Sequence, residues 1–222
     1  MKREQETNKY ITQQIVVYKT TKKLLELNEK LKIANVENYA HIHADGDMNE
    51  NGRKQRSCIG MKLQDYSKKG NTIIVTANIS PEEAAYFYSC VNRGEKVFEF
   101  EQMKIFGEPD KNGNSKVTKL TIKRNTIGSD GKVRKLPWYI QIENGVGIKI
   151  KSQTGGSIMK SGSYQKGNMV FINLSDIDFY KLFYRTVRYV HVWELLVGNF
   201  LLNEGRTLRE EQVAAWLASQ GA

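Results

Sequence analysis

The sequence has few of the residues that mark several large protein classes. Only two cysteines are present, Cys58 and Cys90, too few for a disulfide framework or a four-thiolate metal site. No apolar run approaches the roughly 20 residues that a membrane-spanning helix needs, and the first ten residues lack the apolar core of a signal peptide. Three prolines and 18 glycines among 222 residues argue against fibrous or linker-rich classes. We therefore expect a packed, cytoplasmic protein with two reduced thiols and no membrane partner.

What the chain does have is an excess of positive charge, and the location of this excess is informative. The formal net charge is +10. Residues 111–174 contain twelve lysines and arginines but only two acids, Asp130 and Glu143, so this segment accounts for the whole excess. A clustered excess attracts polyanions, whereas a scattered one mainly keeps a protein soluble. The distribution therefore favours a polyanionic partner.

The order of a turn, an apolar strand and a helix start occurs twice in the chain. Residues 69–83 and 166–178 both begin with Lys-Gly-Asn, continue with a four-residue strand pattern, and reach a serine that is followed three residues later by an acid. These serines, Ser80 and Ser175, are typical N-caps, and Pro81 suits the first helical position. We therefore expect two units that each consist of a sheet and a helix.

Apolar alternation predicts the remaining elements. In the first unit we expect a strand over 13–19, a short lysine-rich helix over 21–33, and a hairpin of 39–43 with 56–63. In the second unit we expect strands over 97–106, 116–124 and 133–142, another beginning at 147–151, and a helix that ends near 202. A capping box at Thr207 and Glu210 predicts a separate final helix.

These elements define an α+β protein in which two repeats of antiparallel β-sheet followed by a helix form one pseudo-symmetric domain with a C-terminal helical tail. The expected divisions are an N-terminal arm over 1–12, a first repeat over 13–96, a second repeat over 97–202 and the tail over 203–222.

Strand alternation sorts the second repeat into two faces, because successive side chains point to opposite sides of a sheet. The face that should pack on the helix carries Leu120, Ile122, Trp138, Ile140, Ile142, Ile148, Ile150, Val170 and Ile172. The opposite face is predicted to be basic with interspersed aromatics and carries Lys119, Lys123, Lys135, Tyr139, Lys149, Lys151 and Phe171, together with Thr121 and Gln141. A weaker version in the first repeat carries Tyr39, Lys54, Arg56 and Lys62, with His41 and His43 beside them.

Such a surface suits single-stranded nucleic acid. Ammonium groups neutralise phosphates and release counterions, while an aromatic ring can stack on any unpaired base. We therefore predict largely sequence-independent binding of a single strand, DNA rather than RNA being favoured.

The doubled pattern of sheet and then helix, over roughly residues 13–202, resembles the Whirly and PC4-like family of single-stranded DNA-binding proteins. The resemblance implies that a sheet face carries the strand, that helices pack behind it, and that subunits associate through those helices. The aromatic-rich helices and the amphipathic tail also offer more apolar surface than two small sheets can cover, so we expect a homo-oligomer.

Two other interpretations use different residues. His41 and His43 alternate along the expected strand with Asp45 and Asp47 close behind, which could ligate a metal. No second His or Asp motif accompanies them, so we expect neither an enzyme, a metal nor a cofactor. The alternative function is that of a phage- or plasmid-type interaction protein that inhibits a nucleic-acid-handling partner and docks through the C-terminal helices.

Overall fold

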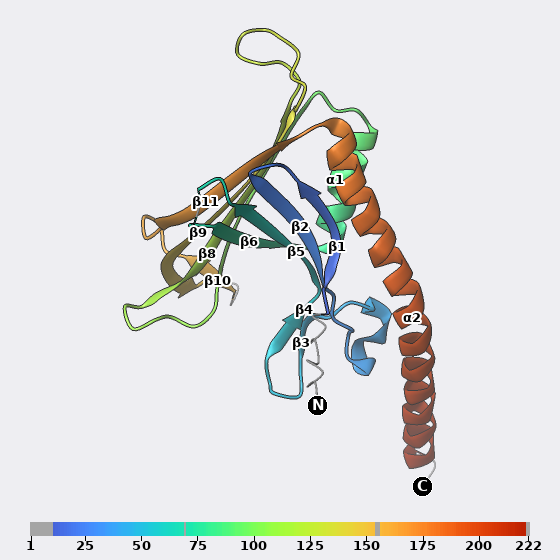
Figure 1. The fold of residues 1–222 in the computed structure, drawn as a ribbon. Coiled ribbons are helices and arrows are strands. Elements are labelled where there is room, and N and C mark those ends of the chain that lie inside the picture. Colours follow the sequence, from blue (N-terminus) through green and yellow to red (C-terminus); the bar gives the residue numbers. More distant parts are fainter. Residues whose placement is uncertain (1–10, 69, 154–155, 221–222) are drawn as a thin grey trace, which may run out of the picture.

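The computed structural model describes residues 11–68, 70–153 and 156–220, and it shows two antiparallel sheets, two α-helices and a small hairpin (Figure 1). The first sheet has the order β1 (Gln14–Lys19), β2 (Lys23–Lys30), β5 (Cys58–Asp65) and β6 (Ile73–Ile79). Helix α1 (Pro81–Asn92) follows it. A 3-10 turn, η1 (Val36–His41), and the hairpin of β3 (Asp45–Met48) and β4 (Lys54–Arg56) lie between β2 and β5.

The second sheet has the order β7 (Val97–Phe106), β8 (Asn114–Asn125), β9 (Trp138–Lys151) and β11 (Gln165–Leu174), and β10 (Ser157–Met159) pairs with the end of β9. Helix α2 (Asp176–Gln220) follows and runs down one side of the molecule (Figure 1). The α+β class with antiparallel sheets is therefore confirmed. Among the described residues, no helix combines the length and the low polarity that crossing a bilayer needs.

Both helix starts form as predicted. At α1, the Ser80 side chain accepts from the Glu83 backbone N–H and the Glu83 carboxylate accepts from the Ser80 N–H, which is a complete capping box. At α2, the Ser175 hydroxyl oxygen accepts from the Asp178 N–H at 3.2 Å. The predicted arm over 1–12 lies almost entirely outside the described residues, as does Lys69 of the first repeated turn.

The predicted helix over 21–33 is wrong. These residues form β2, in which Leu25 and Leu27 are fully buried while Glu26 and Asn28 face the other side. The spacing of the leucines fits both the 3.6-residue period of a helix and the two-residue period of a strand. Pairing with β1 on one side and β5 on the other selects the strand. The predicted strand over 39–43 is also wrong, because most of it lies in η1, and the partners of the hairpin are β3 and β4 instead.

A separate tail helix is also wrong, since α2 continues without a break through Gly205 and Thr207. The Thr207 hydroxyl donates to the Asn203 carbonyl one turn earlier instead of capping a new helix. Glycine inside a helix costs about 1 kcal/mol relative to alanine. Here it has a packing reason, because a Cβ at Gly205 would lie 2.2 Å from the ring of Tyr39. Gly198 likewise leaves space for the Ile42 side chain, since a Cβ there would lie 3.2 Å from Ile42 Cδ1. These two contacts pack η1 and the residue that follows it against α2.

The core lies between the inward faces of the two sheets and the two helices. Helix α2 buries Phe179, Leu182, Phe183 and Val190 at helical spacing, and Phe87 of α1 meets Phe183 at a ring distance of 5.4 Å. Seven of the nine residues predicted for the helix-facing side of the second sheet are buried: Leu120, Ile122, Trp138, Ile140, Ile142, Val170 and Ile172. Ile148 and Ile150 are about 40% exposed, because β9 extends beyond the part of the sheet that the helices cover.

Trp138 joins the second sheet to the start of α2. Its ring is fully buried and stacks on Phe179 at 3.6 Å. Its indole N–H donates to Asp176 Oδ1 at 2.7 Å, and the Arg124 guanidinium binds both oxygens of the same carboxylate. A strand, its neighbour and the helix N-terminus therefore converge on one carboxylate.

Asp176 should make the stability depend on pH. Hydrogen bonds from Arg124, and then from Trp138, hold the pKa of the Asp176 carboxyl below its usual value. A carboxyl whose pKa is lowered on folding contributes stability that is present above its unfolded pKa, about 3.9, and is lost as the pH falls through its folded pKa. The variant Asp176→Asn should therefore lose less stability than the wild type on acidification in urea-unfolding experiments. The difference should be below about 1 kcal/mol, because the carboxylate is half exposed. Equal losses in the two proteins would contradict this expectation.

Candidate nucleic-acid interface

The outer face of the second sheet, which is the side away from the core, brings together four of the predicted contact residues. Strand register places Lys123 beside Tyr139 and aligns Thr121, Gln141 and Phe171 across three strands. The rings of Tyr139 and Phe171 stack with centroids 5.4 Å apart, and Lys119 lies on the same face. These side chains therefore lie on the side of the sheet that strand alternation predicts.

The lysines of this outer face are paired with glutamates. Lys119 lies 3.6 Å from Glu101 and Lys123 lies 2.5 Å from Glu99, both on the neighbouring strand β7. Lys166 pairs with Glu143 at 3.0 Å. Counting charge along the chain missed the two glutamates of β7, because they precede the basic segment in sequence but lie beside it in the sheet. The centre of this face is therefore close to neutral, and a phosphate would have to displace a carboxylate from each lysine.

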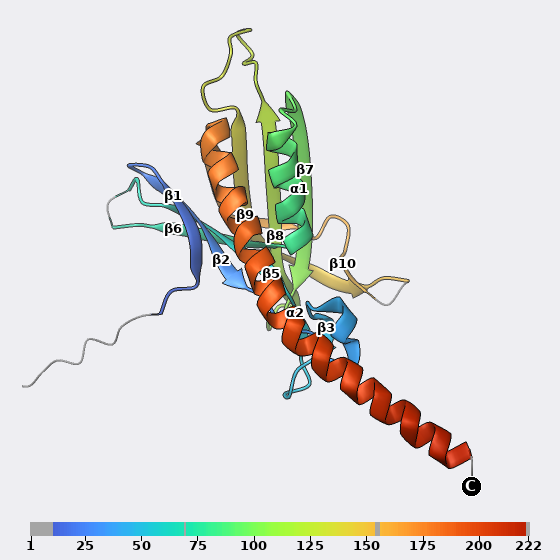
Figure 2. The same cartoon turned by 90° about the vertical axis from the view of Figure 1, so that its right-hand side faces the viewer.

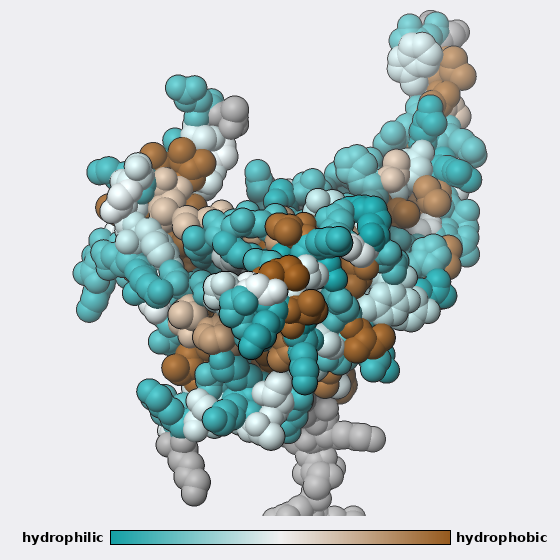
Figure 3. Space-filling model, turned by 90° about the horizontal axis from the view of Figure 1, so that it is seen from above, coloured by the Kyte–Doolittle hydropathy of each residue, from teal (hydrophilic) through white to brown (hydrophobic). Residues whose placement is uncertain are grey.

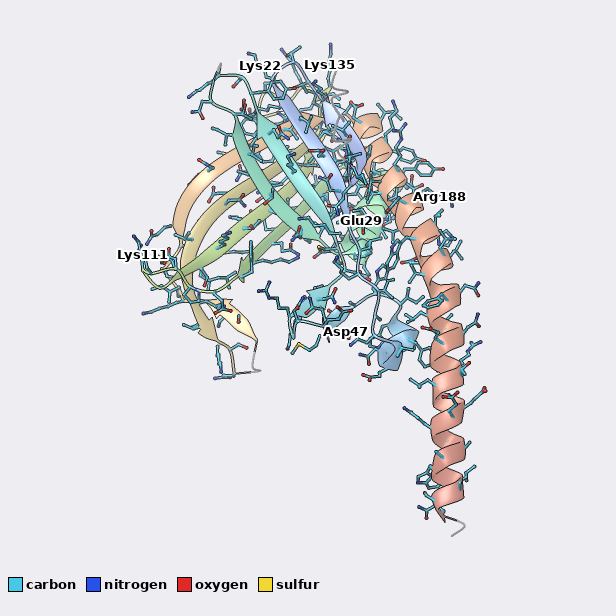
Figure 4. All side chains as sticks on the ribbon, turned by 60° about the horizontal axis from the view of Figure 1, so that its bottom comes forward. Lys22, Glu29, Asp47, Lys111, Lys135 and Arg188 are labelled. Carbon is cyan, nitrogen blue, oxygen red and sulfur yellow. The ribbon has the colours of Figure 1, made fainter. Side chains whose placement is uncertain are left out.

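The remaining predicted residues of the second repeat lie away from that centre. Lys135 is in the exposed loop between β8 and β9, at the other end of β8 from the loop that contains Lys111 (Figure 4). Lys149 donates to the Gly107 carbonyl at 2.6 Å, and Lys151 lies at the far end of β9. Viewed from above, polar side chains dominate the surface, and hydrophobic ones form only small separate patches (Figure 3).

The predicted residues of the first repeat do not share a surface. Tyr39 packs on α2, since residues 36–41 form η1 and not a strand. Lys54 and Arg56 belong to β4, where Arg56 pairs with Asp45 at 2.9 Å. Lys62 lies on the outward side of the first sheet and pairs with Glu26 at 2.9 Å. The prediction that they extend one groove is therefore wrong, and the reason is the failed strand assignment at 39–43.

Strand β6 lies against the concave side of the second sheet, which is the side that faces the core. We call the line of contact between them the inter-sheet seam. The Asn144 side chain accepts from the Thr76 backbone N–H and donates to the Thr76 carbonyl, both at 2.8 Å. Further along the same strand, Lys104 of β7 donates to the Asn78 carbonyl at 3.0 Å. Beside this seam, the outward side of the first sheet and the uncovered end of the concave side of the second sheet meet at an angle.

This junction carries basic residues of which only Lys62 was predicted from the sequence. We call it the inter-sheet surface and define it by Lys30, Lys62, Thr76, Asn78, Lys104 and Lys116. A cavity of about 260 Å³ lies on its first-sheet side, and its lining includes Lys30, Thr76 and the ion pair of Lys62 with Glu26. Phe106, which is directly opposite Lys116 in the strand register, is half exposed and borders the surface. Four lysines and an exposed aromatic ring therefore meet at the inter-sheet seam.

Two of these lysines are held by a neutral residue. Lys30 donates to Asn78 Oδ1 at 3.1 Å, and Lys104 donates to the Asn78 carbonyl. Lys30 reaches Asn78 from two strands away by lying across Gly60, where a Cβ would meet the lysine Cε at 2.7 Å. Among the described residues, neither ammonium group has a carboxylate within ion-pair distance. A phosphate could thus approach both cations without displacing an acid.

The electrostatics of the inter-sheet surface favour an anion. Burial lowers the pKa of the Lys104 ammonium, and Glu83 acts in the opposite direction. Burial raises the pKa of the nearby Cys58 thiol, and Lys30, Lys104 and Lys32 oppose this rise. A lysine whose charged form is disfavoured by burial gains more from a bound anion than a fully hydrated lysine does. Cys58 is half buried, whereas Cys90 is fully buried, so Cys58 can report on what covers this surface.

His43 takes part in a chain of hydrogen bonds and not in an arrangement with His41. Its Nδ1 lies 2.9 Å from Ser57 Oγ and its Nε2 lies 3.0 Å from Glu194 Oε1, while its ring stacks on Trp193. This trio differs from a nucleophilic triad, because the buried Ser57 hydroxyl also donates to the Lys32 carbonyl and accepts from the Lys32 N–H. These hydrogen bonds connect the segment before β3 to α2.

The fold and this surface together define an α+β protein with two antiparallel sheets and a lysine-lined junction between them. No family model matches the chain, and comparison with curated proteins and with solved structures finds no similar protein at a significant level.

Proposed function

We propose that the protein binds single-stranded nucleic acid with little sequence preference, and that the inter-sheet surface contacts the phosphate backbone. The observation that carries the proposal is the pair of ammonium groups, on Lys30 and Lys104, that converge on Asn78 without a carboxylate partner in the described chain. Lysines in this state can exchange a neutral hydrogen-bond acceptor for a phosphate oxygen and release counterions from the nucleic acid. Single-stranded DNA is the favoured ligand.

Binding a single strand requires contacts to unpaired bases as well as to phosphates, and aromatic and aliphatic side chains can supply the base contacts. Phe106 and Ile148 are exposed near Lys116, and the stacked pair of Tyr139 and Phe171 lies on the outer face. Bases of a single strand can stack on such rings, whereas the bases of a duplex are already stacked on one another. The outer face is thus a secondary candidate for base contacts.

The order of elements supports a wider version of this proposal. Four antiparallel strands followed by a helix occur twice, as β1, β2, β5, β6 and α1 and again as β7, β8, β9, β11 and α2. We infer that the two units are pseudo-symmetric repeats and that the protein is a distant relative of the Whirly and PC4-like proteins. On this view the first repeat has gained η1 and the β3–β4 hairpin as an insertion.

Binding to labelled oligo(dT), oligo(U) and a matched duplex tests the proposed function. We expect the single strands to bind more tightly than the duplex, and the logarithm of the binding constant to fall linearly with the logarithm of salt concentration. Bound oligo(dT) should also slow the reaction of Cys58 with a maleimide, because this thiol lies beside Lys30 and Lys104. Equal or tighter duplex binding, or affinity that is insensitive to salt, would contradict the proposal. Binding without protection of Cys58 would move the site to the outer face.

A further inference from the structure

Helix α2 has one covered side and one uncovered side over its C-terminal half. Gly198, Leu201 and Gly205 are buried on the covered side, where η1 packs. The other side faces away from the body and is open along the whole helix, which crosses the front of the molecule in Figure 2. Five large apolar residues there are 48–72% exposed, namely Val192, Leu195, Leu196, Val213 and Leu217, and Phe200 and Trp216, each 60% exposed, flank them.

The residues on the uncovered side follow a heptad spacing. Val192, Leu196, Asn199, Asn203, Arg206, Glu210, Val213 and Leu217 are separated by alternating steps of four and three residues. This is the spacing that keeps one seam of a helix in contact with a second helix over several turns. The seam is apolar at both ends and polar in the middle, and its length is about 38 Å at the rise of an α-helix.

We propose that this seam pairs with the same seam of a second copy of the chain, antiparallel, to form a two-fold symmetric dimer. In the register with the best match, Leu196 faces Val213 of the second copy and Val192 faces its Leu217. By symmetry each contact occurs twice. Leu195 and Trp216, which flank the seam, also meet across the two copies. The apolar residues near the C-terminus of each helix then cover the apolar residues near 192–196 of the other. This pairing explains why these side chains are exposed in a single copy of the chain.

The polar centre selects the antiparallel direction. In the proposed register the Asn203 amide faces Arg206 of the second copy and can accept from its guanidinium, while the Asn199 amide can donate to the Glu210 carboxylate. A parallel pair would instead place Arg206 against Arg206 and Glu210 against Glu210. Like charges directly opposite one another are unfavourable, so the sequence of the seam favours the antiparallel pair.

The rest of the molecule leaves room for this pairing. In an antiparallel pair the two bodies lie at opposite ends of the seam, and only the C-terminal turns of one helix run beside residues 189–200 of the other. The uncovered side of α2 has no other element in front of it in Figure 2. The contact is isologous, since the same surface serves both copies.

A pair of reciprocal charge substitutions tests both the partner and the register. The full chain should be a dimer by light scattering at micromolar concentration. Leu196→Glu and Val213→Lys should each be monomeric, because each places two charges against apolar side chains. The double variant Leu196→Glu/Val213→Lys should recover the dimer, since every introduced glutamate then faces a lysine of the second copy.

The control is folding, which these exposed positions should not affect. Circular dichroism and the urea midpoint of each variant should match the wild type apart from any concentration dependence that dimerisation adds. A wild-type chain that stays monomeric over the micromolar range would overturn the proposal, as would two single variants that remain dimeric. A double variant that stays monomeric while both single variants are folded monomers would overturn the antiparallel register.

Discussion

Replacing Trp138 by alanine should lower the free energy of unfolding by about 3–5 kcal/mol, which is the usual cost of removing a large buried ring. The side chain is fully buried and its ring lies 3.6 Å from Phe179. The truncation also removes the indole N–H that donates to Asp176. Since domains of this size are stable by only about 5–15 kcal/mol, urea unfolding should show a large shift of the midpoint.

The variant Trp138→Phe separates the two contributions of this residue. It keeps most of the stacking area on Phe179 and loses the hydrogen bond to Asp176, so its cost should be clearly smaller than that of Trp138→Ala. Neither variant should change oligonucleotide affinity under conditions in which it is folded, because Trp138 lies on the core side of the sheet. A folded, stable Trp138→Ala that binds poorly would mean that the two faces of the second sheet have been assigned the wrong way round.

Replacing Lys30, Lys104 and Lys116 together by alanine should weaken binding to oligo(dT) by at least about tenfold at low salt. Each phosphate contact on a single strand contributes about 0.7 to the slope of log affinity against log salt, so the slope should flatten by up to about 2. Among the described residues, none of these three lysines forms an ion pair, so their removal leaves no carboxylate without its partner. Folding of the triple variant should therefore be close to that of the wild type.

Two further variants locate the site. Replacing Lys132, Arg134 and Lys135 by alanine removes the same net charge from the exposed loop between β8 and β9, and should have a much smaller effect. Replacing Lys119 and Lys123 tests the outer face, where both lysines already have glutamate partners. If the loop variant lowers affinity as much as the inter-sheet variant, binding depends on net charge alone. If the outer-face variant has the largest effect, the sequence-based choice of surface is correct and the inter-sheet surface is not the site.

Local rules predicted the parts of the fold that depend on neighbouring residues. Ser80 with Glu83 is a capping signal that needs no tertiary context, and alternation along β8 and β9 separated Ile140 from Tyr139 correctly. The same rules failed over 21–33, where the leucines fit a helix as well as a strand and two neighbouring strands decide. The predicted break between residues 202 and 207 is wrong because the partner that Gly205 accommodates, Tyr39, is distant in sequence.

The candidate site was harder to predict than the fold, because its charges are balanced across strands. The basic segment 111–174 is real, but Glu99 and Glu101 from the preceding strand neutralise its central lysines. The convergence of Lys30 and Lys104 on Asn78 joins three segments that are separated by many residues and carries no sequence motif. One available signal was Gly60 inside a strand pattern, since a glycine there often marks a close approach by another group.

The contact between Asn144 and Thr76 also has a consequence for how the protein avoids self-aggregation. An edge strand normally presents free N–H and C=O groups that can recruit a strand from another molecule, and this is a common route to amyloid. On β6, the carboxamide of Asn144 occupies both groups of Thr76 as a neighbouring strand would, and Lys104 occupies the carbonyl of Asn78. Two side chains of the second sheet thus block an edge that would otherwise be open to strand addition, and a chain with alanine at position 144 should form thioflavin-positive aggregates sooner.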